Sequence, residues 1–63
     1  MTLDEKIAIN NYIEKSLGHN SHWYNIYVEW FNLNNYDIMD SQLLMTENQD
    51  MFIEHWKASN NLK

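Results

Sequence analysis

The sequence predicts an all-α fold, a compact three-helix bundle built from a single domain over residues 1–63. Apolar residues recur at helical spacing near both ends of the chain. Two segments, 2–5 and 46–49, match the capping box that opens many helices. The sequence has no proline and one glycine, so little interrupts these patterns. Small helical bundles with mainly local contacts are also well suited to fold at this length.

The first helix is predicted over residues 3–17. Thr2 is the expected N-cap, and Glu5 completes its capping box. Gly18 falls where a helix ends in a left-handed C-cap. One apolar face runs along this helix at helical spacing: Ile9, Tyr12, Ile13 and Leu17.

The second helix is predicted over residues 21–34, within the most apolar stretch of the chain, HWYNIYVEWFNL at 22–33. Asn20 or Ser21 is the expected N-cap, and Asn34 and Asn35 are the expected stop. The polar residues of this stretch are spaced by three, four and three positions, which makes one narrow polar stripe on a helix: His22, Asn25, Glu29 and Asn32.

The alternative for this stretch is an α+β fold with a hairpin over residues 23–39. Aromatic and β-branched residues favour strands, and they occupy alternate positions here: Tyr24, Ile26, Val28 and Trp30. Asn34 and Asn35 would then form the turn. A helix is the preferred interpretation, because Asn32 has the wrong parity for a strand and because a lone hairpin would have only helices to cover it.

The last part of the chain is predicted to hold a short helical turn near 41–45 and a helix over residues 47–59. Asp40 or Ser41 would cap the turn, and the second capping box, from Thr46 to Gln49, would open the helix. Gln49 and Asn60 lie beside an apolar face that is formed by three residues: Phe52, Ile53 and Trp56.

Charge and composition argue against several classes of function. The net charge is −5, and the four lysines, at 6, 15, 57 and 63, form no basic stripe. This argues against direct binding of nucleic acid or of anionic membranes. No apolar run reaches the roughly 18 residues that span a bilayer, and the N-terminus lacks the pattern of a secretory signal, so we expect a soluble, cytoplasmic protein. Frequent Asn and Ile suit an AT-rich genome, such as that of a phage or another mobile element.

Metal and catalytic sites lack their sequence signatures. Cysteine is absent, so neither a disulfide nor a thiolate zinc site can form. His19 and His22 would need a third metal ligand, which His55 could supply only from across the bundle. No glycine-rich phosphate loop or nucleophile elbow is present, and so short a bundle has little volume for a substrate pocket. We expect no catalytic residue, cofactor, bound metal or small-molecule substrate.

The surplus of aromatic residues in the second helix is the strongest functional signal. Its polar stripe covers only about 80° of the helix circumference at 100° per residue, so most of the circumference is apolar. A surface helix normally needs an apolar stripe of only a little over 100°. Only two other helices can cover it. Either the rings fill the core while their polar rims reach solvent, or one flank meets another chain. The predicted partner-binding residues are those of the hot-spot type: Trp23, Tyr24, Tyr27, Trp30 and Phe31.

We therefore predict a small acidic, non-enzymatic protein–protein interaction module. It would bind a protein partner, associate with a second copy as a homodimer, or do both, through the second helix; an inhibitor or regulator from a phage or mobile element is the most concrete form. One alternative is an acidic mimic of nucleic acid that blocks a DNA- or RNA-binding enzyme, which would need clustered carboxylates. Another is a small metal-binding domain that uses the histidines.

Overall fold

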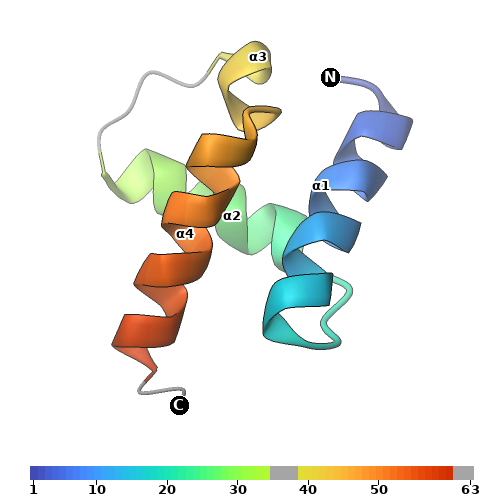
Figure 1. The fold of residues 1–63 in the computed structure, drawn as a ribbon. Coiled ribbons are helices and arrows are strands. Elements are labelled where there is room, and N and C mark those ends of the chain that lie inside the picture. The colour runs from blue at the N-terminus through green and yellow to red at the C-terminus, as the bar shows by residue number, and fades with distance from the viewer. Residues whose placement is uncertain (35–38, 61–63) are drawn as a thin grey trace.

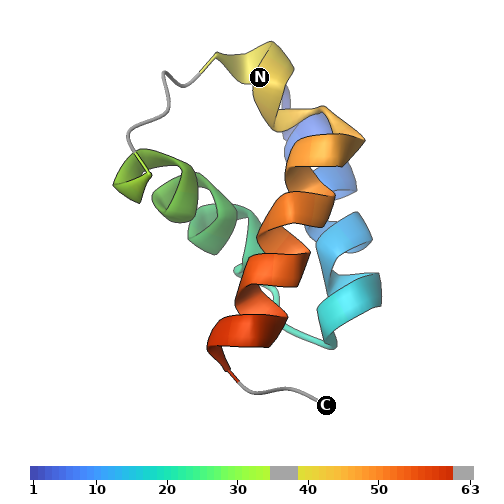
Figure 2. The ribbon, with the colours of Figure 1, turned by 60° about the vertical axis from the view of Figure 1, so that its left-hand side comes forward.

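The computed structural model describes residues 1–34 and 39–60, which form four helices: α1 (Leu3–Leu17), α2 (Trp23–Leu33), α3 (Asp40–Leu43) and α4 (Thr46–Ser59). α1 and α4 run in the same direction, and α2 crosses them (Figures 1 and 2). The short α3 lies at the end of the molecule where the N-terminus is found. The predicted three-helix bundle with a short helical turn is confirmed. The alternative hairpin is wrong for residues 23–33, which are helical; residues 35–38 lie outside the described ranges.

The first helix begins and ends where the sequence predicts. The Thr2 hydroxyl accepts the Glu5 N–H at 3.2 Å, and the Glu5 carboxylate accepts the Thr2 N–H at 3.4 Å, so the capping box is confirmed. Gly18 follows the helix with φ 104° and ψ −176°. The positive φ is as predicted, but the extended ψ places Gly18 in a region essentially restricted to glycine, outside the left-handed helical region.

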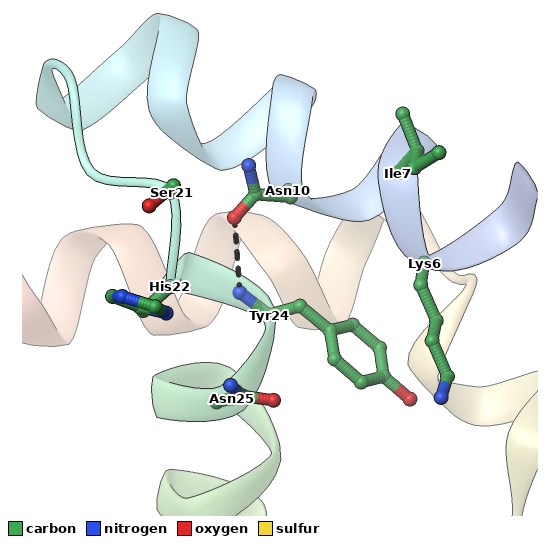
Figure 3. A pocket seen from close by; sticks show the side chains of 7 residues that line it. All are labelled: Lys6, Ile7, Asn10, Ser21, His22, Tyr24 and Asn25. Carbon is green, nitrogen blue, oxygen red and sulfur yellow. Dashed lines mark hydrogen bonds between the residues drawn. The ribbon is translucent and has the colours of Figure 1, made fainter. Parts of the chain in front are cut away.

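The start of α2 is set by a neighbouring helix. The predicted side-chain cap from Asn20 or Ser21 is wrong: the N-cap is His22, which makes no side-chain capping bond. Asn20 instead accepts the His22 N–H at 2.9 Å within the turn. Asn10 of α1 caps α2 from outside, because its Oδ1 accepts the Tyr24 N–H at 3.2 Å (Figure 3). This contact between distant residues satisfies an N–H that the helix itself leaves without a partner.

α3 also begins without the predicted cap. Its N-cap is Met39, which makes no side-chain capping bond, and Asp40 is the first helical residue. The Asp40 carboxylate is drawn away to the Met1 ammonium group, 2.6 Å from it. The interpretation of Asp40 or Ser41 as the cap is therefore wrong.

The second predicted capping box is also absent. α4 begins at Thr46 after the N-cap Met45, so Thr46 lies inside the helix and cannot cap it. Gln49 is buried and turns toward α3, where its Nε2 donates to the carbonyls of Leu43 and Leu44 at 3.5 and 3.3 Å. The amide therefore satisfies carbonyls at the end of α3 that have no partner within so short a helix.

The core is formed where the three long helices and α3 meet, and it is rich in aromatic rings. Ring centroids of Tyr27 and Phe52 are 5.4 Å apart, and those of Trp23 and Trp56 are 5.0 Å apart, both edge-to-face. The sequence predicts Tyr12 on the apolar face, but Tyr12 is exposed and its hydroxyl donates to Asp50 of α4. The buried apolar residues are Ile9, Ile13, Trp23, Tyr27, Phe31, Leu43, Phe52 and Ile53.

Candidate partner-binding groove

An apolar groove of about 290 Å³ runs between α2 and α4, and we call it the α2/α4 groove. Each wall is a stripe of residues at helical spacing. α2 contributes Ile26, Glu29, Trp30 and Leu33. α4 contributes Phe52, His55, Trp56, Ser59 and Asn60.

Two indole rings line this groove, and each packs against a buried ring of the core. The Trp30 ring lies 5.5 Å from Phe52 and 5.6 Å from the His55 ring. The Trp56 ring packs edge-on against Trp23 at 5.0 Å. Both tryptophans are only half-buried. Each indole therefore presents a rigid apolar surface that needs little ordering when a partner binds.

The rim of the groove combines an exposed leucine with one acidic side chain. Leu33 is 74% exposed, which extends the apolar surface beyond the groove. Glu29 is exposed, and among residues 1–34 and 39–60 it forms no ion pair. Among residues 1–34 and 39–60, no lysine lines the groove.

The donors at the α4 edge are already engaged within their own helix. The Asn60 amide donates to the Trp56 carbonyl at 2.9 Å. The Ser59 hydroxyl lies 3.4 Å from His55 Nε2. The groove therefore offers mainly shape and apolar surface, with Glu29 as its exposed acidic acceptor.

The five predicted partner-binding residues do not share one surface. Trp23, Tyr27 and Phe31 are 4%, 0% and 4% exposed and belong to the core of this chain. Trp30 lies in the groove, and Tyr24 is half-buried on the α1 side of the helix. Residues 23, 27 and 31 follow one another every four positions, so they form a single inward stripe, and 24 and 30 flank it. Only Tyr24 and Trp30 keep a surface that a partner could contact.

Sequence reasoning misses the α4 wall, most of all His55 and Trp56. The signal in the sequence is the apolar spacing of Trp56 with Phe52, which by itself predicts only a core face. Leu33 is also missed, although it ends the aromatic stretch one residue after the polar Asn32. The pairing of the two stripes depends on how α2 crosses α4.

A second, more polar pocket of about 190 Å³ lies between α1 and α2 (Figure 3). The Lys6 ammonium sits 5.6 Å from the centroid of the Tyr24 ring, and the Tyr24 hydroxyl donates to the Met1 sulfur at 3.3 Å. Burial, with a smaller contribution from the Asp40 charge, raises the pKa of Tyr24. Ser21 and His22 line this pocket with no hydrogen bond between them, so it holds no pairing of a nucleophile with a base.

Several charged groups are used within the fold. Glu14 pairs with His19, Asp40 with the Met1 ammonium, and Asp50 accepts the Tyr12 hydroxyl. The hydrogen bond to Asp50 is the main cause that raises the pKa of Tyr12. Within the part of the chain that the structure describes, no group of three or more His, Asp or Glu residues is placed to hold a metal ion.

Comparison with protein families, with characterised proteins and with solved structures finds no match for this chain. Over the described residues, no helix combines the length and the apolar character that crossing a bilayer requires. Function is therefore inferred from the geometry and chemistry of the α2/α4 groove.

Proposed function

We propose that this protein is a small acidic, non-enzymatic protein–protein interaction module that holds an apolar anchor of a partner protein in the α2/α4 groove. One observation carries the proposal: two half-buried tryptophans, supported from below by core rings, line an open groove that continues onto the exposed Leu33. Trp is enriched among the residues that dominate binding energy in protein interfaces. An exposed apolar surface of this kind on a small domain commonly serves as an interaction site.

The size of the groove favours a protein side chain over a small-molecule substrate. Its volume of about 290 Å³ lies at the lower limit of pockets that enclose drug-sized ligands. One or two large apolar side chains would fill it. The core already contains Trp23, Tyr27 and Phe31, so the proposed interface uses one flank of α2, with Trp30 and Leu33, together with α4.

An inhibitor or regulator from a phage or mobile element is the concrete form of this proposal, and its support is compositional. The cytoplasmic location stays a prediction. The Asp40 carboxylate is paired with the Met1 ammonium group within the fold, so its charge does not support a nucleic-acid mimic. That alternative predicts binding that weakens steeply with salt and is insensitive to changes at the tryptophans.

A peptide-display selection tests the proposal and does not require an identified partner. Peptides would be selected on the wild-type protein and then measured against Leu33→Asp and Leu3→Asp. The two leucines are 74% and 71% exposed, so neither change should disturb folding, but Leu3 does not line the groove. We expect selected peptides to lose about tenfold or more in affinity for Leu33→Asp, because a charge would enter the apolar rim, and to bind Leu3→Asp normally. Equal binding to both variants would overturn the proposal.

A further inference from the structure

Polar side chains at the α4 edge of the groove already make contacts within this chain, which favours a partner whose backbone satisfies its own hydrogen bonds. Among the side chains at the α4 edge, Asn60 donates within α4, and Ser59 lies within hydrogen-bond distance of His55. The remaining walls are mainly apolar, with Ile26, Trp30, Leu33, Phe52 and Trp56. An extended peptide would bring unsatisfied backbone groups against this surface at a cost. A helix carries its hydrogen bonds internally and can dock through side chains alone.

The walls also have the length and repeat of a helix-binding surface. The α2 stripe runs from Ile26 to Leu33, and the α4 stripe from Phe52 to Asn60. At 1.5 Å per residue these stripes are about 10 and 12 Å long, which matches two turns of a docked helix. Because α2 crosses α4, a docked helix would follow one stripe, and one or two of its apolar side chains at i and i+3 or i+4 would enter the groove between the two.

The rim of the groove selects for positive charge on the partner. Glu29 lies within the α2 stripe, and among the residues that the structure describes it forms no ion pair and shares the groove with no lysine. Covering its carboxylate with an apolar surface would cost free energy, whereas a Lys or Arg on the partner would make a charge-assisted hydrogen bond. A second copy of this chain is a poor occupant, because both copies would bring Glu29 and a net charge of −5 to a two-fold interface.

We infer that the occupant of the α2/α4 groove is an amphipathic helix of a partner protein, with a Lys or Arg placed against Glu29. This inference rests on the proposed function and specifies its partner. The apolar face of the helix contacts Trp30, Leu33 and Trp56, and its cationic side chain lies one turn away from the apolar anchor. The acidic chain as a whole also attracts such a partner during diffusion.

Three synthetic peptides of equal length serve as probes. The first is a leucine–lysine peptide whose leucines fall on one helical face. The second replaces every lysine with glutamate, and the third has the first peptide's composition in strict alternation, which disfavours an amphipathic helix. Binding to the full chain would be followed by NMR chemical shifts and by calorimetry at physiological salt. The leucine–lysine helix should bind most tightly, with the largest shifts at Trp30, Leu33 and Trp56.

Two matched variants separate a specific contact from general attraction to an acidic protein. Glu29→Gln should lower the affinity for the leucine–lysine peptide about fivefold, which is the effect of losing one ion pair at the rim. Glu54→Gln removes the same charge from an exposed position of α4 that does not line the groove, and it should change binding little. Equal losses in both variants, or equal binding of the alternating peptide, would overturn the inference.

The remaining outcomes distinguish this inference from the proposed function. If the leucine–glutamate peptide binds in the groove more tightly than the leucine–lysine peptide, the charge assignment fails while the groove remains a binding site. If Leu33→Asp leaves the binding of every peptide unchanged, the groove itself is not the site and both proposals fail. A dimer in sedimentation equilibrium that Leu33→Asp dissociates would replace the helical partner with a second copy.

Discussion

Replacing Tyr27 with phenylalanine removes one hydroxyl from the centre of the core and leaves the ring contacts in place. Tyr27 is 0% exposed, and its ring lies 5.3 and 5.4 Å from those of Phe31 and Phe52. Its hydroxyl donates to the Leu43 carbonyl at 3.3 Å, a carbonyl that Gln49 also reaches. A neutral hydrogen bond contributes about 0.5–1.5 kcal/mol. At neutral pH we expect Tyr27→Phe to lower the free energy of unfolding by about 1 kcal/mol, because Gln49 still serves the carbonyl.

At alkaline pH the sign of this difference should reverse. Burial raises the pKa of Tyr27 far above the ordinary value of about 10. An unfolded chain loses the phenolic proton from about pH 10 upward while the folded chain keeps it, so the hydroxyl destabilises the fold by about 1.4 kcal/mol for each further pH unit. Phenylalanine has no proton to lose. The wild type and Tyr27→Phe should therefore be equally stable near pH ~11, with the variant more stable above it.

Urea denaturation followed by tryptophan fluorescence measures this comparison across the pH range. Other groups titrate in both proteins, so the difference between the two unfolding free energies isolates Tyr27. A difference that stays constant from neutral pH to about pH 11 would refute the reasoning. It would mean that the hydroxyl reaches water and that the packing of α2 against α3 and α4 differs from the structure.

Three further substitutions test other parts of the fold. Trp23→Ala removes a buried ring and the hydrogen bond from its indole N–H to the Gly18 carbonyl, at 3.0 Å. We expect the free energy of unfolding to fall by about 3–5 kcal/mol, out of about 3–9 kcal/mol for the whole domain. A sharp thermal transition like that of the wild type would contradict this. Asn10→Ala should lower the free energy of unfolding by about 1 kcal/mol, because the Tyr24 N–H loses its cap. Asn11 is exposed, so Asn11→Ala should change stability and melting temperature little. Equal effects of the two substitutions would exclude the cap. In Gly18→Ala the added Cβ would have no atom within 4 Å. The expected decrease of about 1–3 kcal/mol in the free energy of unfolding therefore comes from the positive φ alone. No decrease in calorimetry would rule out that backbone conformation.

The candidate site shows where sequence patterns stop being informative. The narrow polar stripe of the second helix correctly indicates that α2 is apolar around most of its circumference. It does not indicate which apolar residues are covered, because that depends on the direction from which α1 and α4 approach. Trp23 and Trp30 have the same chemistry and lie two turns apart, yet one is core and the other lines the groove. Trp56 joins the site because α4 crosses α2 beside it.

The helices and their amphipathic faces follow from local sequence, since they depend on interactions within a few residues along the chain. The capping box of Thr2 and Glu5, the break at Gly18 and the apolar spacing of Phe52 and Ile53 are all local properties, and the structure keeps each of them. Three other features depend on how the helices pack: the cap on α2 from Asn10, the burial of Gln49 against α3 and the apolar groove between α2 and α4. Each of these joins elements that pack together in space, and local patterns do not specify how helices cross.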